Sequence, residues 1–337
     1  MLKRFIQEIV EGRDLSFDEM KEAMDIIMSG KTNDIQIAAF LTALRVKGET
    51  IDEISAAATV MREKAEPLDI DKDVILDTCG TGGDSSGTIN ISTGVAIVTA
   101  AAGIHVAKHG NRAATSKSGS ADVLKALGIN IDLSPEEIKK CIDTVNIGFL
   151  FAPNFHKAMK YAGNVRKEVG IRTIFNILGP LTNPAKNTHH LMGVFTEELT
   201  EKIAGVLKRL GSTHALVVCG EGGIDEIILS GYTKISELKN GNIKTYRVKP
   251  SLYDIKEQPL SAIQGGSPEE NARILMEIFD GTRKDAYYDA IVLNSGYALY
   301  TADKVNNPKE GMNLARTLIA DGKVKEKLEQ FKECSNK

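Results

Sequence analysis

Apolar residues in the first 66 positions recur with the period of amphipathic helices, and almost no strand pattern is present. The stretches SFDEMKEAMDIIMSG, TNDIQIAAFLTALRVKG and TIDEISAAATVMREKA each carry an apolar stripe. Ser16 with Glu19, and Thr50 with Glu53, stand at the spacing of a capping box, and the middle stretch opens with a threonine and an asparagine. We therefore predict a helical bundle behind a first helix. Such a bundle is small and needs something else to pack against.

From Pro67 the pattern changes to short apolar runs that alternate with helical stretches. The runs VILDTCG, HVAKHG, GFLFAP and HALVVCG end in glycine, proline or polar residues, and SPEEIKKCIDTV between them places Pro135 after the N-cap residue Ser134. This alternation predicts an α/β fold with a mostly parallel sheet and helices on its faces. In open sheets of this kind the ligand crevice lies at the carboxyl ends of the strands.

The first predicted strand runs into a glycine-rich turn, DTCGTGGDSSGTINIST, residues 77–93. The turn is not a P-loop, because Gly83 is followed by Asp84 and Ser85 and not by lysine with a hydroxyl residue. It is not a dinucleotide fingerprint either, because Ser85 stands where that motif needs glycine. Glycines before a helix that begins near Ser92 still predict a cradle of N–H groups for an anion. A glycine-rich connector capped by its own serine and aspartate is the simpler alternative.

A second polar segment follows the next strand, KHGNRAATSKSGSAD, residues 108–122. Lys108, His109 and Arg112 stand there among glycine, asparagine and hydroxyl residues, a composition that suits a polyanion. Alone, the segment could be a solvated basic loop. Because successive strand ends converge on one crevice, the two segments together indicate a phosphorylated ligand.

Further along, GEGGIDEIILSG sets Asp225 and Glu226 side by side before an apolar, strand-like run. Carboxylates suit Mg²⁺, which also keeps waters and substrate phosphate oxygens as ligands. An adjacent aspartate and glutamate are also common on solvated protein surfaces, which is the alternative interpretation.

In the segment 151–185, Arg166 and Arg172 are equal candidates to bind a substrate carboxylate, and His156 is given no chemical role.

Composition and charge narrow the classes of function. The 337 residues, with 42% hydrophobic and 26% charged, are typical of a globular protein, and a net charge of −3 argues against broad affinity for nucleic acid. The four cysteines form no CxxC pair, so neither a zinc site nor a disulfide framework is predicted, and Cys79 is interpreted as a small tolerated side chain and not a nucleophile. Neither a signal peptide nor a run of about 18 apolar residues is present, so we expect no membrane association and a cytoplasmic location.

Taken together, DTCGTGGD, GTINIST, KHGNRAATS, SGSADVLKALG, FAPNFHKAMKYAGNVRKEVGIRTIFNILGPLTNPA and GIDE closely resemble the anthranilate phosphoribosyltransferase family. The resemblance runs in order from the N-terminal helices to at least Glu226. It implies a small helical domain joined to a larger α/β domain of the nucleoside phosphorylase and phosphoribosyltransferase type. Residues 1–70, with the returning segment 155–185, would form the helical domain, and residues 71–154 and 186–337 the α/β domain. The resemblance also implies a homodimer formed through the helical part.

The same resemblance implies an activity and a set of ligands. The enzyme would transfer the phosphoribosyl group of phosphoribosyl pyrophosphate (PRPP) to the amino group of anthranilate, in tryptophan biosynthesis, with Mg²⁺. The implied metal contacts are Ser92, Asp225 and Glu226, and the implied anthranilate contacts are Gly80, Asn111 and Arg166. The implied PRPP contacts are Gly80, Gly83, Asp84, Thr88, Asn90, Ser92, Thr93, Lys108, Asn111, Arg112, Ser116 and Ser120.

His109 could take part in proton transfer or only orient the substrate, and no protein nucleophile is required. Thr115, Lys157 and the run GNVR depart from the family's commoner residues, and the last two lie near the expected approach of the aromatic acid. A nucleoside phosphorylase of related architecture is the alternative enzyme, and a non-catalytic relative that binds nucleic acid is the alternative from another class.

Overall fold

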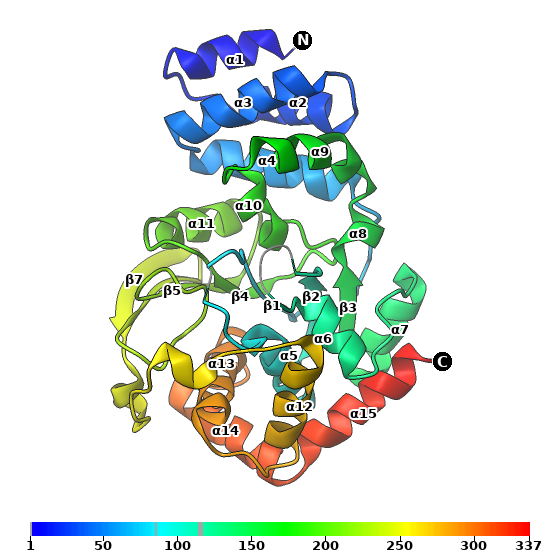
Figure 1. Cartoon of the computed structure of the whole chain (residues 1–337), viewed down its shortest axis with the longest axis vertical. Coiled ribbons are helices and arrows are strands. Elements are labelled where there is room, and N and C mark those ends of the chain that lie inside the picture. Colours follow the sequence, from blue (N-terminus) through cyan, green and yellow to red (C-terminus); the bar gives the residue numbers. More distant parts are fainter. Residues whose placement is uncertain (1, 85, 114–116) are drawn as a thin grey trace.

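The computed structural model describes residues 2–84, 86–113 and 117–337. Its N-terminal part consists of four helices that stand at one end of the molecule, above the sheet in Figure 1. The capping boxes predicted at Ser16 and Thr50 are both formed, and Asn33 caps the third helix. The helices are α1 (Lys3–Val10), α2 (Phe17–Met28), α3 (Asp34–Lys47) and α4 (Ile51–Lys64).

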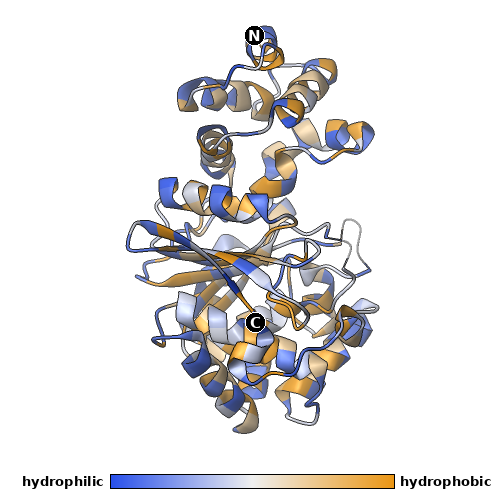
Figure 2. Cartoon of the chain, turned by 90° about the vertical axis from the view of Figure 1, so that its left-hand side faces the viewer, coloured by the Kyte–Doolittle hydropathy of each residue, from blue (hydrophilic) through white to orange (hydrophobic). Residues whose placement is uncertain are grey.

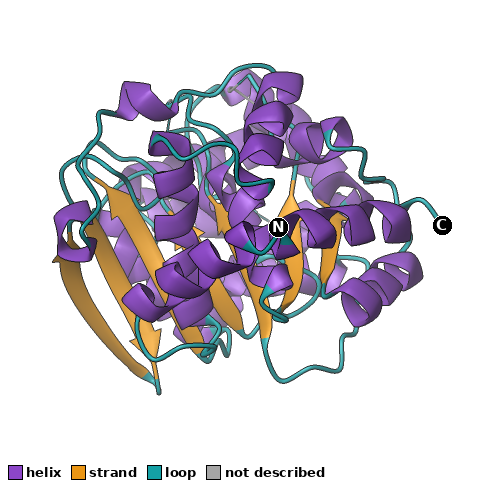
Figure 3. Cartoon of the chain, turned by 90° about the horizontal axis from the view of Figure 1, so that it is seen from below, coloured by secondary structure: helices purple, strands orange, loops and turns teal. Residues whose placement is uncertain are grey.

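The centre of the molecule is a seven-stranded sheet in the order β3-β2-β1-β4-β5-β6-β7. The first five strands pair in parallel, and β6 and β7 add an antiparallel hairpin at one edge, so the expectation of a mostly parallel sheet is confirmed. The strands lie side by side in the view from below in Figure 3. Their bounds are β1 (Ile75–Gly80), β2 (His105–Gly110), β3 (Ile147–Phe151), β4 (His189–Gly193), β5 (His214–Gly220), β6 (Thr233–Lys239) and β7 (Asn242–Val248).

One predicted strand is absent, because residues 227–230, after the acidic pair, form no strand. Their backbone is bound by side chains and not by a neighbouring strand. The N–H of Ile227 donates to Asn294 Oδ1 (3.0 Å), and the N–H of Ile228 donates to Thr233 Oγ1 (3.2 Å). An apolar run here therefore marks buried irregular backbone whose polar groups are satisfied by other means.

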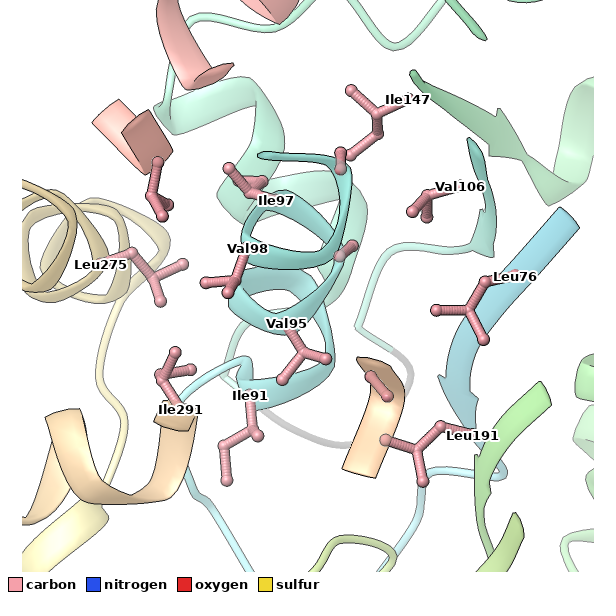
Figure 4. Packing of buried hydrophobic residues seen from close by; sticks show 14 of the residues in the cluster. Leu76, Ile91, Val95, Ile97, Val98, Val106, Ile147, Leu191, Leu275 and Ile291 are labelled. Atoms are coloured by element: carbon pink, nitrogen blue, oxygen red, sulfur yellow. The ribbon is translucent and has the colours of Figure 1, made fainter. Parts of the chain in front are cut away.

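Apolar side chains of the strands alternate between the two faces of the sheet, and each face has its own buried cluster. The upper cluster lies on the face toward the N-terminal helices and includes Met192 and Val217. The lower cluster lies on the opposite face and includes Leu76, Leu191 and Leu216. Figure 4 shows the lower cluster, where α5 (Ile91–Ala101) packs against strand residues and later helices, and Figure 2 shows the hydropathy of the elements on both sides. The lower layer also contains α6 (Ser120–Ala126), α7 (Pro135–Val145), α12 (Pro268–Phe279), α13 (Ala286–Thr301), α14 (Pro308–Ala320) and α15 (Lys323–Ser335).

The upper cluster joins the N-terminal helices to segments from much later in the chain. After β3 the chain returns through α8 (Ala152–Phe155) to α9 (Lys160–Val169), which packs against α2 and α3. Ala162 and Val165 of α9 and Phe175 of α10 (Phe175–Leu178) share one buried cluster with α1–α4 and with α11 (Glu198–Arg209). Because buried contacts continue from the helices to the sheet, the division into domains at residues 70, 155 and 185 stays a prediction. No helix in the described part of the chain is long and apolar enough to cross a membrane.

Candidate active site

The candidate site lies where the strand order reverses. The chain builds β1, β2 and β3 toward one edge and then places β4 and β5 on the other side of β1. A crevice opens at such a switch point, outside the carboxyl ends of the strands. Gly80 and Gly193, the last residues of β1 and β4, are partners there, and the N–H of Thr81 donates to the carbonyl of Gly193 (3.0 Å).

Carboxylates from distant segments occupy the N–H groups of the glycine turn and of helix α5. Asp225 Oδ2 accepts the N–H of Gly82 (2.7 Å), and Glu226 Oε1 accepts the N–H of Ser92 at the start of α5 (3.3 Å). Asp84 Oδ2 in turn accepts the N–H of Asp225 (3.4 Å). The glycine turn and the acidic pair, about which the sequence allowed separate interpretations, therefore form one site. Its N–H groups already bind carboxyl oxygens, as a phosphate cradle would bind phosphate oxygens.

Glycine is required where the acidic segment crosses the strand ends. A Cβ at Gly193 would lie 1.6 Å from the carbonyl oxygen of Asp225, and one at Gly80 would lie 2.4 Å from Asp225 Oδ2. Neither distance is physically possible. Gly193 thus lets the backbone of Asp225 lie directly against β4, and Gly80 lets the carboxyl group of Asp225 lie against the end of β1.

Three carboxylates and one ammonium group determine the electrostatics. Burial, with the nearby Asp84 carboxylate, raises the pKa of Asp225 to about 7, and burial with Asp225 raises the pKa of Glu226 well above its ordinary value. Lys108 is buried, and its ammonium group donates to the carbonyl of Thr78 and to Ser92 Oγ (3.2 Å). This single charge does not neutralise three carboxylates, so a bound cation would stabilise their ionised forms.

The carboxylates of Asp225 and Glu226 supply only some of the oxygen ligands that Mg²⁺ needs. Among residues 2–84, 86–113 and 117–337, no three His, Cys, Asp or Glu side chains are arranged to hold a metal ion. Mg²⁺ normally takes one or two carboxylates and completes its octahedron with waters and substrate phosphate oxygens. Asp225 and Glu226 therefore fit a metal that arrives with a polyphosphate.

The second polar loop folds over the start of α5. Asn90, just before α5, donates from Nδ2 to the carbonyl of Ser118 (3.1 Å). Ser120 Oγ donates to the carbonyl of Asn111 (3.3 Å), and Arg112 pairs with Asp122 (3.2 Å). The loop after β2 is thus held beside the glycine turn, as the convergence of strand ends predicts. Ser116 and Thr115, which belong to this loop in sequence, lie outside the described residues.

The remaining candidates of the glycine segment differ in accessibility. Thr88 is half-buried with its hydroxyl 3.3 Å from that of Ser86, whereas Thr93 is fully buried beneath the start of α5. The carbonyl of Gly83 accepts a hydrogen bond from Arg172. Cys79 is buried, and burial together with the Asp77 carboxylate raises the pKa of its thiol well above the ordinary value. This environment opposes a nucleophilic thiolate and agrees with the interpretation of Cys79 as a tolerated side chain.

Two histidines lie on the side of the site that faces the helical part. His109 Nδ1 is 3.2 Å from the carbonyl of Gly179, which can only accept, so Nδ1 carries the proton and Nε2 a lone pair. Burial lowers the pKa of His109 to about 3 and that of His156 to about 4, so both imidazoles are neutral at physiological pH. Their ring centroids are 5.1 Å apart. His156 was missed from the sequence because a single histidine between helices carries no local signal of its neighbours.

The two candidate arginines occupy different places. Arg166, on α9, has its guanidinium carbon 5.2 Å from the centroid of the Phe175 ring, and burial lowers its pKa. Arg172 lies at the glycine turn, with its guanidinium carbon 4.1 Å from the centroid of Phe195. The geometry therefore separates the two, placing Arg172 beside the predicted anion cradle and Arg166 on the returning segment.

Comparison with known protein families assigns the chain to a class of enzymes. Residues 72–325 match the model of the a/b domain of a glycosyl transferase family, and residues 3–65 match the model of that family's helical bundle domain. The fold is that of a glycosyl transferase family with a helical bundle domain and an a/b domain.

Individual relatives make the assignment narrower. The anthranilate phosphoribosyltransferases of Petrotoga mobilis and Acetivibrio thermocellus are 51% and 52% identical, and each match covers all of this chain and 97% of the relative. The solved structure of the Thermus thermophilus enzyme has a TM-score of 0.94 at 41% identity, covering 98% of this chain and 99% of that one. The Saccharomyces cerevisiae enzyme in complex with PRPP and Mg has a TM-score of 0.91 at 31% identity, covering 99% and 98%. This chain belongs to the anthranilate phosphoribosyltransferase family.

Proposed function

We propose that the protein transfers the phosphoribosyl group of PRPP to anthranilate, with pyrophosphate as the leaving group, in tryptophan biosynthesis. The observation that carries the proposal is the set of bonds around the acidic pair: Asp225 accepts the N–H of Gly82 in the glycine turn, and Glu226 accepts the N–H of Ser92 in α5. Asp84 of the turn in addition accepts the N–H of Asp225. A C–N bond forms between the anomeric carbon and the amine, the bond from that carbon to the pyrophosphate oxygen breaks, and the proton of the amine passes to the released pyrophosphate or to water. Positioning and electrostatic stabilisation account for the catalysis, since no covalent intermediate is needed.

The proposed binding site for PRPP lies at the carboxyl ends of the strands. We propose that the glycine turn, the start of α5 and the loop after β2 bind the phosphates and ribose of PRPP. Asp225, Glu226 and Ser92 would hold Mg²⁺, which supplies positive charge to the leaving pyrophosphate. Lys108 supports this arrangement by holding Ser92 Oγ from below (3.2 Å). The proposed contacts are Gly80, Gly83, Asp84, Thr88, Asn90, Ser92, Thr93, Lys108, Asn111, Arg112, Ser116 and Ser120.

The proposed binding site for anthranilate lies at the junction between the sheet and the helical part. We propose that anthranilate contacts Gly80, Asn111 and Arg166, with the guanidinium of Arg166 toward its carboxylate. Neutral His109 presents a lone pair on Nε2, to which an amine can donate a hydrogen bond. Because its pKa is only about 3, His109 orients the amine and does not take up a second proton, on Nε2, at neutral pH.

The direct test measures the consumption of anthranilate and its dependence on PRPP and Mg²⁺. Purified protein is mixed with anthranilate, PRPP and Mg²⁺, and anthranilate fluorescence is followed, with controls that lack PRPP or contain EDTA. A decrease that needs both PRPP and Mg²⁺ is the expected result. Phosphorolysis of thymidine or uridine without anthranilate turnover would assign the site to a nucleoside phosphorylase instead.

We also infer a homodimer formed through the helical part, and a cytoplasmic location. Support for the dimer comes from apolar side chains exposed on α1 and α3: Val46 is 83% exposed, Ile35 80% and Val10 67%. Val46→Asp should convert a dimer to a monomer in light scattering after gel filtration. Leu252→Asp, which changes an exposed apolar residue at a distant 3₁₀ turn, is the matched control. A wild-type monomer at micromolar concentration would contradict the inference.

A further inference from the structure

A half-buried arginine lies at the junction of the helical part and the sheet, without an acidic partner in the described part of the chain. Arg62 lies in the last turn of α4, and its Nε–H donates to the carbonyl of Leu181 (2.7 Å). One terminal nitrogen of its guanidinium is buried and has no hydrogen-bond partner within the described part of the chain. Burial alone shifts the pKa of Arg62, without a contribution from any described carboxylate. A buried, unpaired cation is costly, and burial lowers the pKa of Arg62 to about 10.

The turn that Arg62 holds is also held by the two histidines of the candidate site. His109 bonds to the carbonyl of Gly179, and His156 bonds to the backbone of Thr182, on either side of the Leu181 carbonyl that Arg62 binds. The charge of Arg62 is close enough to His109 to contribute to lowering its pKa.

The unsatisfied atoms around this turn define a pattern. Besides the Arg62 nitrogen, which can only donate, the Nε2 atoms of His109 and His156 are buried and lack partners among the described residues. With the proton of His109 on Nδ1, its Nε2 can only accept. A ligand that satisfies these atoms carries both an anionic oxygen, which accepts from Arg62, and an N–H group, which donates to a histidine.

We infer that Arg62 binds the carboxylate of the acceptor substrate, as a second cation beside the proposed Arg166. The inference rests on the proposed function, because an ortho-amino carboxylate has the complementary groups: its carboxylate accepts from Arg62 while its amine donates to the histidines. Arg62 is thus a specificity-determining residue that distinguishes an aromatic acid from its neutral analogue. It belongs to the helical part, so recognition of the acceptor depends on both parts of the fold.

The test compares anthranilate with its methyl ester, which has the same ring and amine without the negative charge. Affinities are measured by fluorescence titration for the wild type, for Arg62→Met, which keeps the aliphatic bulk, and for Arg62→Lys, which keeps the charge. We expect Arg62→Met to lose about 10- to 100-fold in affinity for anthranilate, the range for a charged hydrogen bond, with less than about threefold change for the ester. Arg62→Lys should recover part of the loss.

Control measurements separate this role from a structural one. Arg283→Met removes an arginine paired with Glu277 and Asp285, away from the site, and should leave both affinities unchanged. The KM for PRPP should stay within about twofold in Arg62→Met. Equal loss of affinity for acid and ester would overturn the inference, because it would mean that Arg62 only supports the turn. So would unchanged affinity for both.

Wild-type turnover reports separately on the proposed function. A wild type that binds anthranilate by way of Arg62 without consuming it in the presence of PRPP would refute the activity and leave the role of Arg62 standing. A wild type that binds no anthranilate would refute both.

Discussion

Replacing Asp77 by asparagine removes a charge from the centre of the sheet while keeping the shape of the side chain. Asp77 Oδ1 accepts the backbone N–H of His109 (3.3 Å), and Oδ2 accepts Asn183 Nδ2–H (2.8 Å). Asn183 cannot turn over, because its Nδ2 also donates to the carbonyl of Ala107 (2.8 Å) and its Oδ1 accepts the N–H of Ala185 (3.0 Å). The new amide must therefore keep its oxygen toward Asn183 and leave the N–H of His109 unpaired.

Two opposing free energies set the size of the effect on stability. An unpaired buried N–H lowers the free energy of unfolding by about 1–3 kcal/mol. Against this, burial raises the pKa of Asp77 from 3.8 to about 6, so the ionised carboxylate destabilises the native protein at neutral pH. That shift corresponds to about 3 kcal/mol, which Asp77→Asn relieves. Near pH 7.5 we therefore expect the variant to equal the wild type or to exceed it by up to about 2 kcal/mol.

The dependence on pH gives the sharper test. Because the folded pKa lies above the unfolded one, the cost of the Asp77 charge is complete above the folded value and disappears as the pH falls toward the unfolded value. Between about pH 7.5 and pH 5, the difference in unfolding free energy should move by about 1.5 kcal/mol in favour of the wild type. Urea unfolding followed by circular dichroism at the two pH values measures it. The same difference at both would refute the reasoning, since Asp77 would then carry no buried charge.

Two further changes test the acidic segment of the site. Asp225→Asn combined with Glu226→Gln should lower turnover at limiting Mg²⁺ by at least about tenfold with an unchanged circular dichroism spectrum, because two charged oxygen ligands are lost; full activity at limiting Mg²⁺ would exclude these residues as metal ligands. Gly193→Ala should raise the KM for PRPP by displacing the backbone of Asp225, whose oxygen would lie 1.6 Å from the new Cβ. Gly163→Ala, where nothing lies within 4 Å of the new Cβ, is the control, and a Gly193 variant with the wild-type KM would contradict the role given to that glycine.

The elements that could be predicted from the sequence are those whose signal is local. The capping boxes at Ser16 and Thr50 and four of the parallel strands follow from residues within a few positions of one another. Strand β4 was missed because it opens with His189 and His190, polar residues that are buried in the sheet. The hairpin β6–β7 was missed because β7 is polar and largely exposed at the edge.

For the site as well, features with a local signal in the sequence could be predicted, and contacts between distant residues could not. That the glycine turn suits an anion could be predicted, because glycines before a helix indicate exposed N–H groups. The pairing of Asp225 with Gly82 could not, since 143 positions separate the two residues and nothing near either one specifies the contact. The contact of Arg62 could not be predicted either. The sequence indicates only an exposed residue in the last turn of a helix, whereas its hydrogen-bond partner, the carbonyl of Leu181, lies 119 positions later.

The return of α9 and α10 to the N-terminal helices has a consequence for biosynthesis. The apolar faces of α1–α4 leave the ribosome first, but Ala162, Val165 and Phe175, which complete their buried cluster, are translated about a hundred residues later. At usual translation rates the nascent helices therefore wait several seconds or more with part of that surface in water. Contacts across such sequence distances also slow folding, since loop closure must precede them. The helical part, first in the sequence, is thus among the last to be completed, and chaperones that bind apolar helices would meet it during this interval.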